Sequence, residues 1–197
     1  MRWLLAFSCL ALQACDAPGD RPVMARDDPT ATVIDEETLL DSEPGNGLPP
    51  LFLDWEGVRE IDPSTGATQL RRFGTERAFV EKLAADALKV DGSRSSNDEC
   101  GAGPMEFTSF GSVTLNFQDG KFVGWFAEGR DDLGTINEVK IGGPRADVEK
   151  IDGFSLLEDS TLGAEFSIEG DVSGFFEVDA KGWNVASLFA GTNCFFR

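Results

Sequence analysis

The chain has 197 residues, a formal net charge of -18 and no histidine. Without histidine, Ser-His and Cys-His nucleophilic catalysis and all His-ligated metal sites are excluded, which leaves carboxylates, Lys, Arg and thiols for chemistry. The negative charge disfavours nucleic acid as a partner because phosphates are repelled. It favours either simple solubility or a basic protein partner.

The N-terminal residues predict export followed by lipidation. Arg2 supplies a positive start, and the apolar run at 3–12 is shorter than the about 20 residues that a membrane-spanning helix needs. The tetrad Leu12-Gln13-Ala14-Cys15 closes this run and resembles the lipobox of bacterial lipoproteins. The resemblance implies a signal peptide at 1–14 and a lipidated Cys15; a plain secretory signal is the alternative.

Residues 15–50 are predicted to form a lipidated cysteine followed by a disordered acidic linker. The linker carries nine acids against Arg21 and Arg26, and it is rich in Pro and Gly. A flexible chain of this length spans roughly 30–35 Å. The prediction is a periplasmic domain tethered to the lipid bilayer through acylated Cys15. The sequence does not choose between the inner and the outer membrane.

The first folded unit is predicted at 51–128. A short strand at 51–53 precedes a hairpin of 57–61 and 68–73, whose turn contains Pro63 and Gly66. A helix is predicted to start at an N-cap, Thr75, and to end before Asp91, and a polar loop covers 93–98. Alternation at 113–118 predicts a strand that returns through 122–126. The apolar helix face comprises Phe79, Val80, Leu83, Ala87 and Leu88.

The second unit is predicted at 129–197 because the pattern recurs. The stretches 77–83 and 145–151, RAFVEKL and RADVEKI, match at five positions, and each is followed by an acid–aromatic step, Glu106-Phe107 and Glu165-Phe166. Strands are predicted at 172–178 and 183–189. Together these observations predict an α+β fold of two tandem units, each a helix packed on an antiparallel β-sheet. Chance similarity of a short charged helix is the alternative.

Two resemblances accompany this pattern. Gly74 to Val80 and Gly142 to Val148 are similar to the Gly-Met-Thr-x-x-Glu-Val helix start of beta-lactamase-inhibitor-protein-like repeat units, although both copies lack Met-Thr. The resemblance implies helices over an antiparallel sheet whose open face binds another protein. The lipobox, the run 99–104 (ECGAGP) and the end 194–197 (CFFR) look like an uncharacterised family of Gram-negative bacterial lipoproteins, which implies no activity.

Two cysteines, Cys100 and Cys194, remain after removal of Cys9 and lipidation of Cys15. In an oxidising periplasm they are predicted to form a disulfide. The alternatives are two free thiols or a metal site, for which two sulfurs without histidine are a poor ligand set. No cofactor, metal site or catalytic residue is predicted. The loop around Cys100 lacks the Lys and Ser or Thr of a phosphate-binding loop.

The predicted function is a membrane-tethered protein-binding or structural module, not an enzyme. Aromatic residues are enriched in interfaces, so the candidate partner contacts are Trp125, Phe126, Trp183 and Phe189. The alternative is that these rings fill the core.

Two other functions stay open. The first is a carboxylate-based envelope hydrolase that uses Glu106 and Glu165, whose separation would have to be about 5–10 Å. The second is a binder of a small apolar ligand held between the sheet and the helices.

Overall fold

The computed structural model describes residues 51–62, 64–129, 133–135, 138–170, 172–180 and 182–195. The predicted signal peptide, the lipidation of Cys15 and the acidic linker lie outside the described residues. Within the described residues, no helix has the length and apolar character needed to cross a membrane.

A small four-stranded sheet opens the fold. Its strands are β1 (Phe52–Asp54), β2 (Gly57–Ile61), β3 (Thr68–Arg72) and β8 (Gly134–Thr135), in the order β3-β2-β1-β8. The hairpin of β2 and β3 is antiparallel, as predicted from the turn residues between them. Among the described strands, only the short β8 pairs in parallel, with β1.

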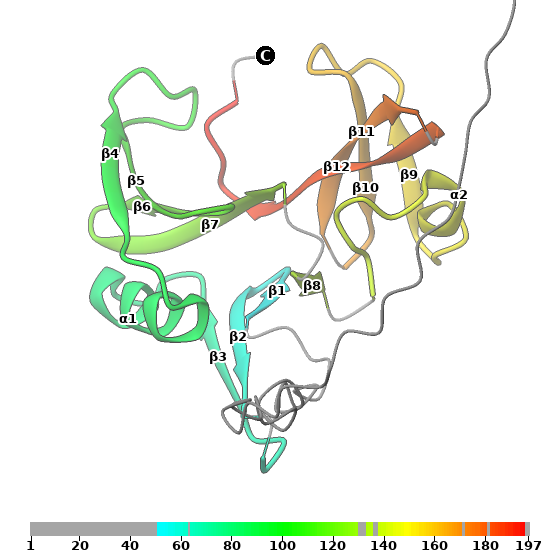
Figure 1. Cartoon of the computed structure of the whole chain (residues 1–197). Helices are drawn as coiled ribbons and strands as arrows, with labels where there is room; N and C mark the ends of the chain where they lie inside the picture. The colour runs from blue at the N-terminus through cyan, green and yellow to red at the C-terminus, as the bar shows by residue number, and fades with distance from the viewer. Residues whose placement is uncertain are drawn as a thin grey trace, which may run out of the picture. The chain divides into compact units, whose positions relative to one another are not determined.

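The other eight strands form a single antiparallel sheet (Figure 1). Two consecutive meanders, β4 to β7 and β9 to β12, meet where β7 pairs with β12, giving the order β4-β5-β6-β7-β12-β11-β10-β9. The strands are β4 (Ser93–Asn97), β5 (Met105–Phe110), β6 (Val113–Gln118), β7 (Lys121–Glu128), β9 (Phe154–Leu157), β10 (Ala164–Ile168), β11 (Ser173–Asp179) and β12 (Gly182–Gly191).

The predicted α+β fold of two helix-on-sheet units is wrong, because the described chain is mostly β and its strands form two sheets. Its helices are α1 (Arg77–Leu88) and a single turn, α2 (Arg145–Val148). Gly153, at φ +81°, turns the chain soon after α2, which leaves no room for a second long helix. The predicted loop at 93–98 is largely the edge strand β4.

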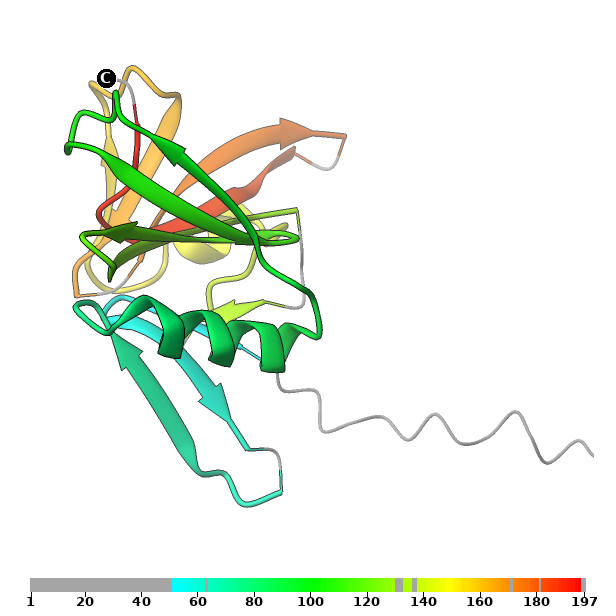
Figure 2. The ribbon, with the colours of Figure 1, turned by 90° about the vertical axis from the view of Figure 1, so that its left-hand side faces the viewer.

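The core lies on one face of the large sheet. Figures 1 and 2 show α1 and the small sheet lying against the half made of β4 to β7, and α2 contacts β12 in the other half. Trp125 of β7 is fully buried here, and its Nε1 donates a hydrogen bond to the backbone oxygen of Asp54, 2.8 Å away. This bond connects the large sheet to the small one. We call the opposite side of the large sheet the open face.

Helix α1 differs from its prediction at two points. Its N-cap is Glu76, which makes no side-chain capping bond, and not Thr75. Phe79 is 61% exposed, whereas the predicted apolar face had included it. Val80 and Leu83 are buried as predicted, and Ala84, which the prediction omitted, is buried beside them. The buried stripe is therefore narrower than the sequence pattern indicated.

A polar clamp holds α1 on the sheet. Arg77 Nε lies 2.8 Å from Glu81 Oε1, and an Arg77 terminal nitrogen donates to Thr108 Oγ1 at 2.8 Å. The Arg77 guanidinium also lies 4.7 Å from the centroid of the Phe117 ring. Burial raises the pKa of Glu81, but hydrogen bonds from Arg94, Thr108 and Arg77 outweigh it and lower the pKa from 4.5 to about 2.

We expect Glu81→Gln to lower the free energy of unfolding by about 2 kcal/mol near neutral pH, because hydrogen bonds to a charged acceptor are lost. The folded-state pKa is depressed, so this stabilisation is complete above the ordinary pKa of 4.5 and is lost as the pH falls towards about 2. Urea unfolding across this range should therefore show the difference between the two proteins shrinking in acid.

The control is Asp86→Asn, which breaks the exposed ion pair with Lys82 on the same helix. We expect it to change stability by less than about 1 kcal/mol. Equal losses for the two variants would contradict the clamp.

Candidate functional site

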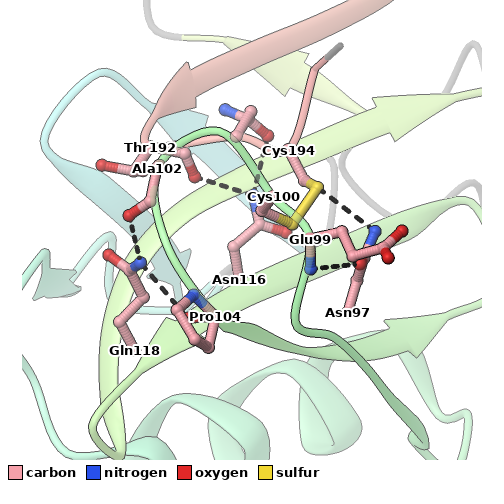
Figure 3. Close-up of a disulfide and its surroundings, with 10 residues drawn as sticks. Asn97, Glu99, Cys100, Ala102, Pro104, Asn116, Gln118, Thr192 and Cys194 are labelled. Carbon is pink, nitrogen blue, oxygen red and sulfur yellow. Dashed lines mark hydrogen bonds between the residues drawn. A yellow bond between two sulfur atoms is a disulfide. The ribbon is translucent and has the colours of Figure 1, made fainter.

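The C-terminal residues 192–195, which we call the strap, leave β12 and rise between the two halves of the large sheet (Figure 1). The predicted pairing of Cys100 with Cys194 is confirmed, and the disulfide connects the strap to the loop between β4 and β5 (Figure 3). Gln118 of β6 steadies this loop, because its Nε2 donates to the backbone oxygens of Ala102 and Pro104 at 2.9 and 3.3 Å.

Asparagine side chains of the large sheet donate hydrogen bonds to the strap. Asn116, on β6, is 2% exposed, and its Nδ2 donates to the backbone oxygen of Thr192 at 2.9 Å and to Asn193 Oδ1 at 2.7 Å (Figure 3). Asn97, at the end of β4, directs its Nδ2 to the sulfur of Cys194 at 3.6 Å. The strap is therefore fixed by a covalent bond and by amide hydrogen bonds from two different strands.

An aromatic cluster completes the attachment. Phe195 of the strap lies edge-on to Phe126, Phe175 and Phe189, with ring centroids 6.2, 5.6 and 4.9 Å away. These three rings belong to β7, β11 and β12, so Phe195 covers the open face where the two halves of the sheet join. The contacts bury Phe189 to 8% exposure.

A pocket of about 330 Å³ lies beside the strap on the open face. Strands β4 to β7 form its floor and the strap forms one wall. No lining residue is charged, which contrasts with the net charge of -18 of the chain. The lining residues are Asn97, Phe107, Thr114, Asn116, Phe126, Asn193, Cys194 and Phe195.

A second feature lies on the other face, at the end of the β11–β12 hairpin. Trp183 and Val178 are cross-strand neighbours and are 47% and 63% exposed. The guanidinium of Arg145, from α2, lies 5.6 Å from the centroid of the Trp183 ring and 5.3 Å from that of Phe176. These contacts orient the tryptophan while much of it stays accessible. We call Trp183, Val178 and Arg145 the hairpin patch.

The structure separates the four predicted contact residues. Trp125 is a core residue, which is the alternative that its sequence context had left open. Phe126 and Phe189 lie beneath the strap, and only Trp183 is broadly exposed. Strand alternation explains the split between the first two, because successive side chains point to opposite faces.

Glu106 and Glu165 do not form a catalytic pair. They lie on β5 and β10, five strand positions or about 24 Å apart along the sheet. Glu106 is half exposed and paired with Arg77, whereas Glu165 is buried and accepts a hydrogen bond from Ser160 Oγ at 2.6 Å. The predicted equivalence of the two acid–aromatic steps is therefore wrong, and the separation is too large for a glycosidase.

The strap contacts were not found from the sequence. Asn116 follows the polar phase of an alternating strand, which is typical of a solvent-facing residue. An aromatic residue directly after a paired cysteine, as in Cys194-Phe195, was the one available signal that the C-terminus is held against the fold. Among the described residues, no group of three or more Cys, Asp or Glu side chains is arranged to hold a metal ion.

Comparison with protein-family models, with curated proteins and with solved structures returns no match to this chain.

We expect the double substitution Cys100→Ala with Cys194→Ala to lower the free energy of unfolding by about 3–5 kcal/mol, because the disulfide closes a loop with a sequence separation of 94. Urea unfolding measures the loss. A thiol reductant should destabilise the wild-type protein by a similar amount and leave the double variant unchanged. An unaltered midpoint in both tests would show that the amides and rings hold the strap without the disulfide.

Proposed function

We propose that the chain is a lipid-anchored periplasmic protein, tethered through Cys15, that binds another protein. The lipobox-like tetrad supports the anchor, and the acidic residues 16–50 supply the tether. A tether of roughly 30–35 Å lets the folded part search the space near the bilayer. The proposed location is the periplasmic side of the cell envelope.

The observation that carries the binding proposal is the hairpin patch. Trp and Arg are the residues most enriched among binding hot spots, and here Arg145 holds the ring of an exposed Trp183. Exposed Val178 extends the apolar area on the same face of the hairpin. With a net charge of -18 on the whole chain, this arrangement favours a partner with a basic rim around an apolar centre.

The hydrolase alternative loses its support, because its two carboxylates lie too far apart. The small-ligand hypothesis also changes. The space between the large sheet and the helices is filled by one continuous apolar core, which includes Val80, Leu115 and Trp125. The pockets beside α1 and α2 are lined by charged side chains such as Glu81 and Asp147, so an uncharged apolar ligand fits better in the pocket on the open face.

The partner can be captured by placing a photocrosslinking amino acid at position 178 of the lipidated protein in intact cells. We expect a discrete adduct from this position, because it adjoins Trp183. The control is position 79 on α1, where the native side chain is 61% exposed compared with 63% for Val178. Adding Trp183→Ala should lower the adduct yield about tenfold or more. Identical adducts from the two positions, or none from 178, would refute the patch.

A basic partner also predicts a salt effect in envelope extracts. Raising the ionic strength to about 0.5 M should weaken capture at position 178, since screening reduces the attraction between opposite charges. Capture that is unaffected by salt would leave a purely apolar contact and exclude the basic rim.

The anchor is tested by metabolic labelling with a fatty acid. We expect label in the wild-type chain and none in Cys15→Ala, while Cys9→Ala, which changes the other N-terminal cysteine, should still be processed and labelled. Unlabelled wild-type protein would leave plain secretion as the route of export.

A further inference from the structure

We propose that the pocket beside the strap binds a small uncharged molecule with an aromatic body and one N–H or O–H donor, and that the site exists only while the Cys100–Cys194 disulfide is intact. This site is separate from the hairpin patch. Phe189 and Phe126, which adjoin the strap, point to the open face, whereas Trp183 and Val178 share the α2 side with Phe176.

The size and charge of the pocket indicate a small, uncharged, aromatic ligand. Its volume of about 330 Å³ lies at the lower end of the range for ligand pockets, about 300–1,000 Å³. Three of its eight lining residues are phenylalanines and none is charged, so neither an anion nor a cation would find a counter-charge there. The net charge of -18 further repels anions.

Asn116 indicates that the ligand carries a hydrogen-bond donor. The two carbonyl oxygens that accept from its Nδ2 fix the orientation of the amide, and no described residue donates a hydrogen bond to its Oδ1. Among the described residues, Arg71 Nε is the side-chain polar atom that is both inaccessible and without a hydrogen-bond partner. Asn116 Oδ1 also has no partner, so it must be accessible. Because Asn116 is only 2% exposed, the space that its Oδ1 reaches is the pocket that the residue lines. A ligand donor would satisfy this acceptor.

The disulfide requirement follows from the walls. Three of the lining residues, Asn193, Cys194 and Phe195, belong to the strap. Without the covalent bond, Thr192 and Asn193 keep their backbone and amide hydrogen bonds, and the rest of the strap depends on the Phe195 ring contacts. If the strap leaves, the wall is lost and the floor becomes an open apolar surface with no defined cavity.

The test uses the whole mature chain, exported behind a cleavable secretory signal with Cys15→Ala so that no detergent is needed. The probe is N-phenyl-1-naphthylamine, an uncharged arylamine with one N–H, whose fluorescence rises in apolar surroundings. We expect saturable binding to the oxidised protein. Two matched probes test the chemistry: 1-phenylnaphthalene lacks the N–H and should bind about tenfold more weakly, and 8-anilinonaphthalene-1-sulfonate adds an anion and should not saturate the site.

Thr114→Phe fills the pocket from its floor and should weaken binding of the arylamine about tenfold or more. Ser167→Phe is the matched control: it adds the same ring on the open face of β10, outside the pocket, and should leave binding unchanged. Reduction of the disulfide should abolish saturable binding without any substitution. Retained binding in Thr114→Phe or in the reduced protein, or equal binding of the sulfonate, would overturn the proposal.

The two proposals can fail independently. Trp183→Ala should bind the arylamine like the wild type, and Thr114→Phe should still be captured by a partner at position 178. A lack of arylamine binding alongside normal capture would refute the pocket alone.

Discussion

The pairing of β7 with β12 is the interaction on which the rest of the structure depends. It joins two meanders into one sheet, with register from Ser187 opposite Glu128 to Gly191 opposite Gly124. A Cβ at Gly124 would lie 2.2 Å from the oxygen of Thr192, and Gly191 has φ +69°, so both positions require glycine. The chain turns onto the open face directly after this close approach. The strap, and with it the pocket, therefore begins where two glycines let the strands meet.

The two halves of the sheet follow the same plan and differ in one element. Gly74 and Gly142 have positive φ, and each donates its N–H at 2.7 Å to a backbone oxygen near the start of the last strand of its meander. Three residues later, Arg77 and Arg145 begin the helices. The guanidinium of each covers a phenylalanine ring on the third strand of its meander, β6 in the first half and β11 in the second. This correspondence supports an internal duplication, which stays a prediction. The difference is α2: with one turn of helix, the second half leaves its hairpin end uncovered.

The hairpins could be predicted from the sequence because turn residues and the alternation of apolar side chains depend on neighbouring residues. The β2–β3 and β6–β7 hairpins were predicted because their glycines and period of two specify a turn and one buried face. Strand β4 was missed because Ser-Arg-Ser-Ser-Asn has no apolar phase; only pairing with β5 makes it a strand. The Glu106 and Glu165 comparison failed because a dipeptide match does not define register, and a slip of one residue reverses the face.

Strand β12 explains how one small domain presents two unlike surfaces. It carries Trp183 near its start and Phe189 near its end, and it pairs with β11 between Gly182 and Phe189 and with β7 between Ser187 and Gly191. Its ten residues extend over about 33 Å, and Trp183 lies six positions or about 20 Å from Phe189, so the hairpin patch and the strap are separated along one strand. Because their side chains leave the sheet on opposite faces, a protein at the patch and a ligand in the pocket would not exclude one another. A change at one surface could reach the other through a shift of β12 against β7. The close pairing of Gly191 with Gly124 opposes such a shift.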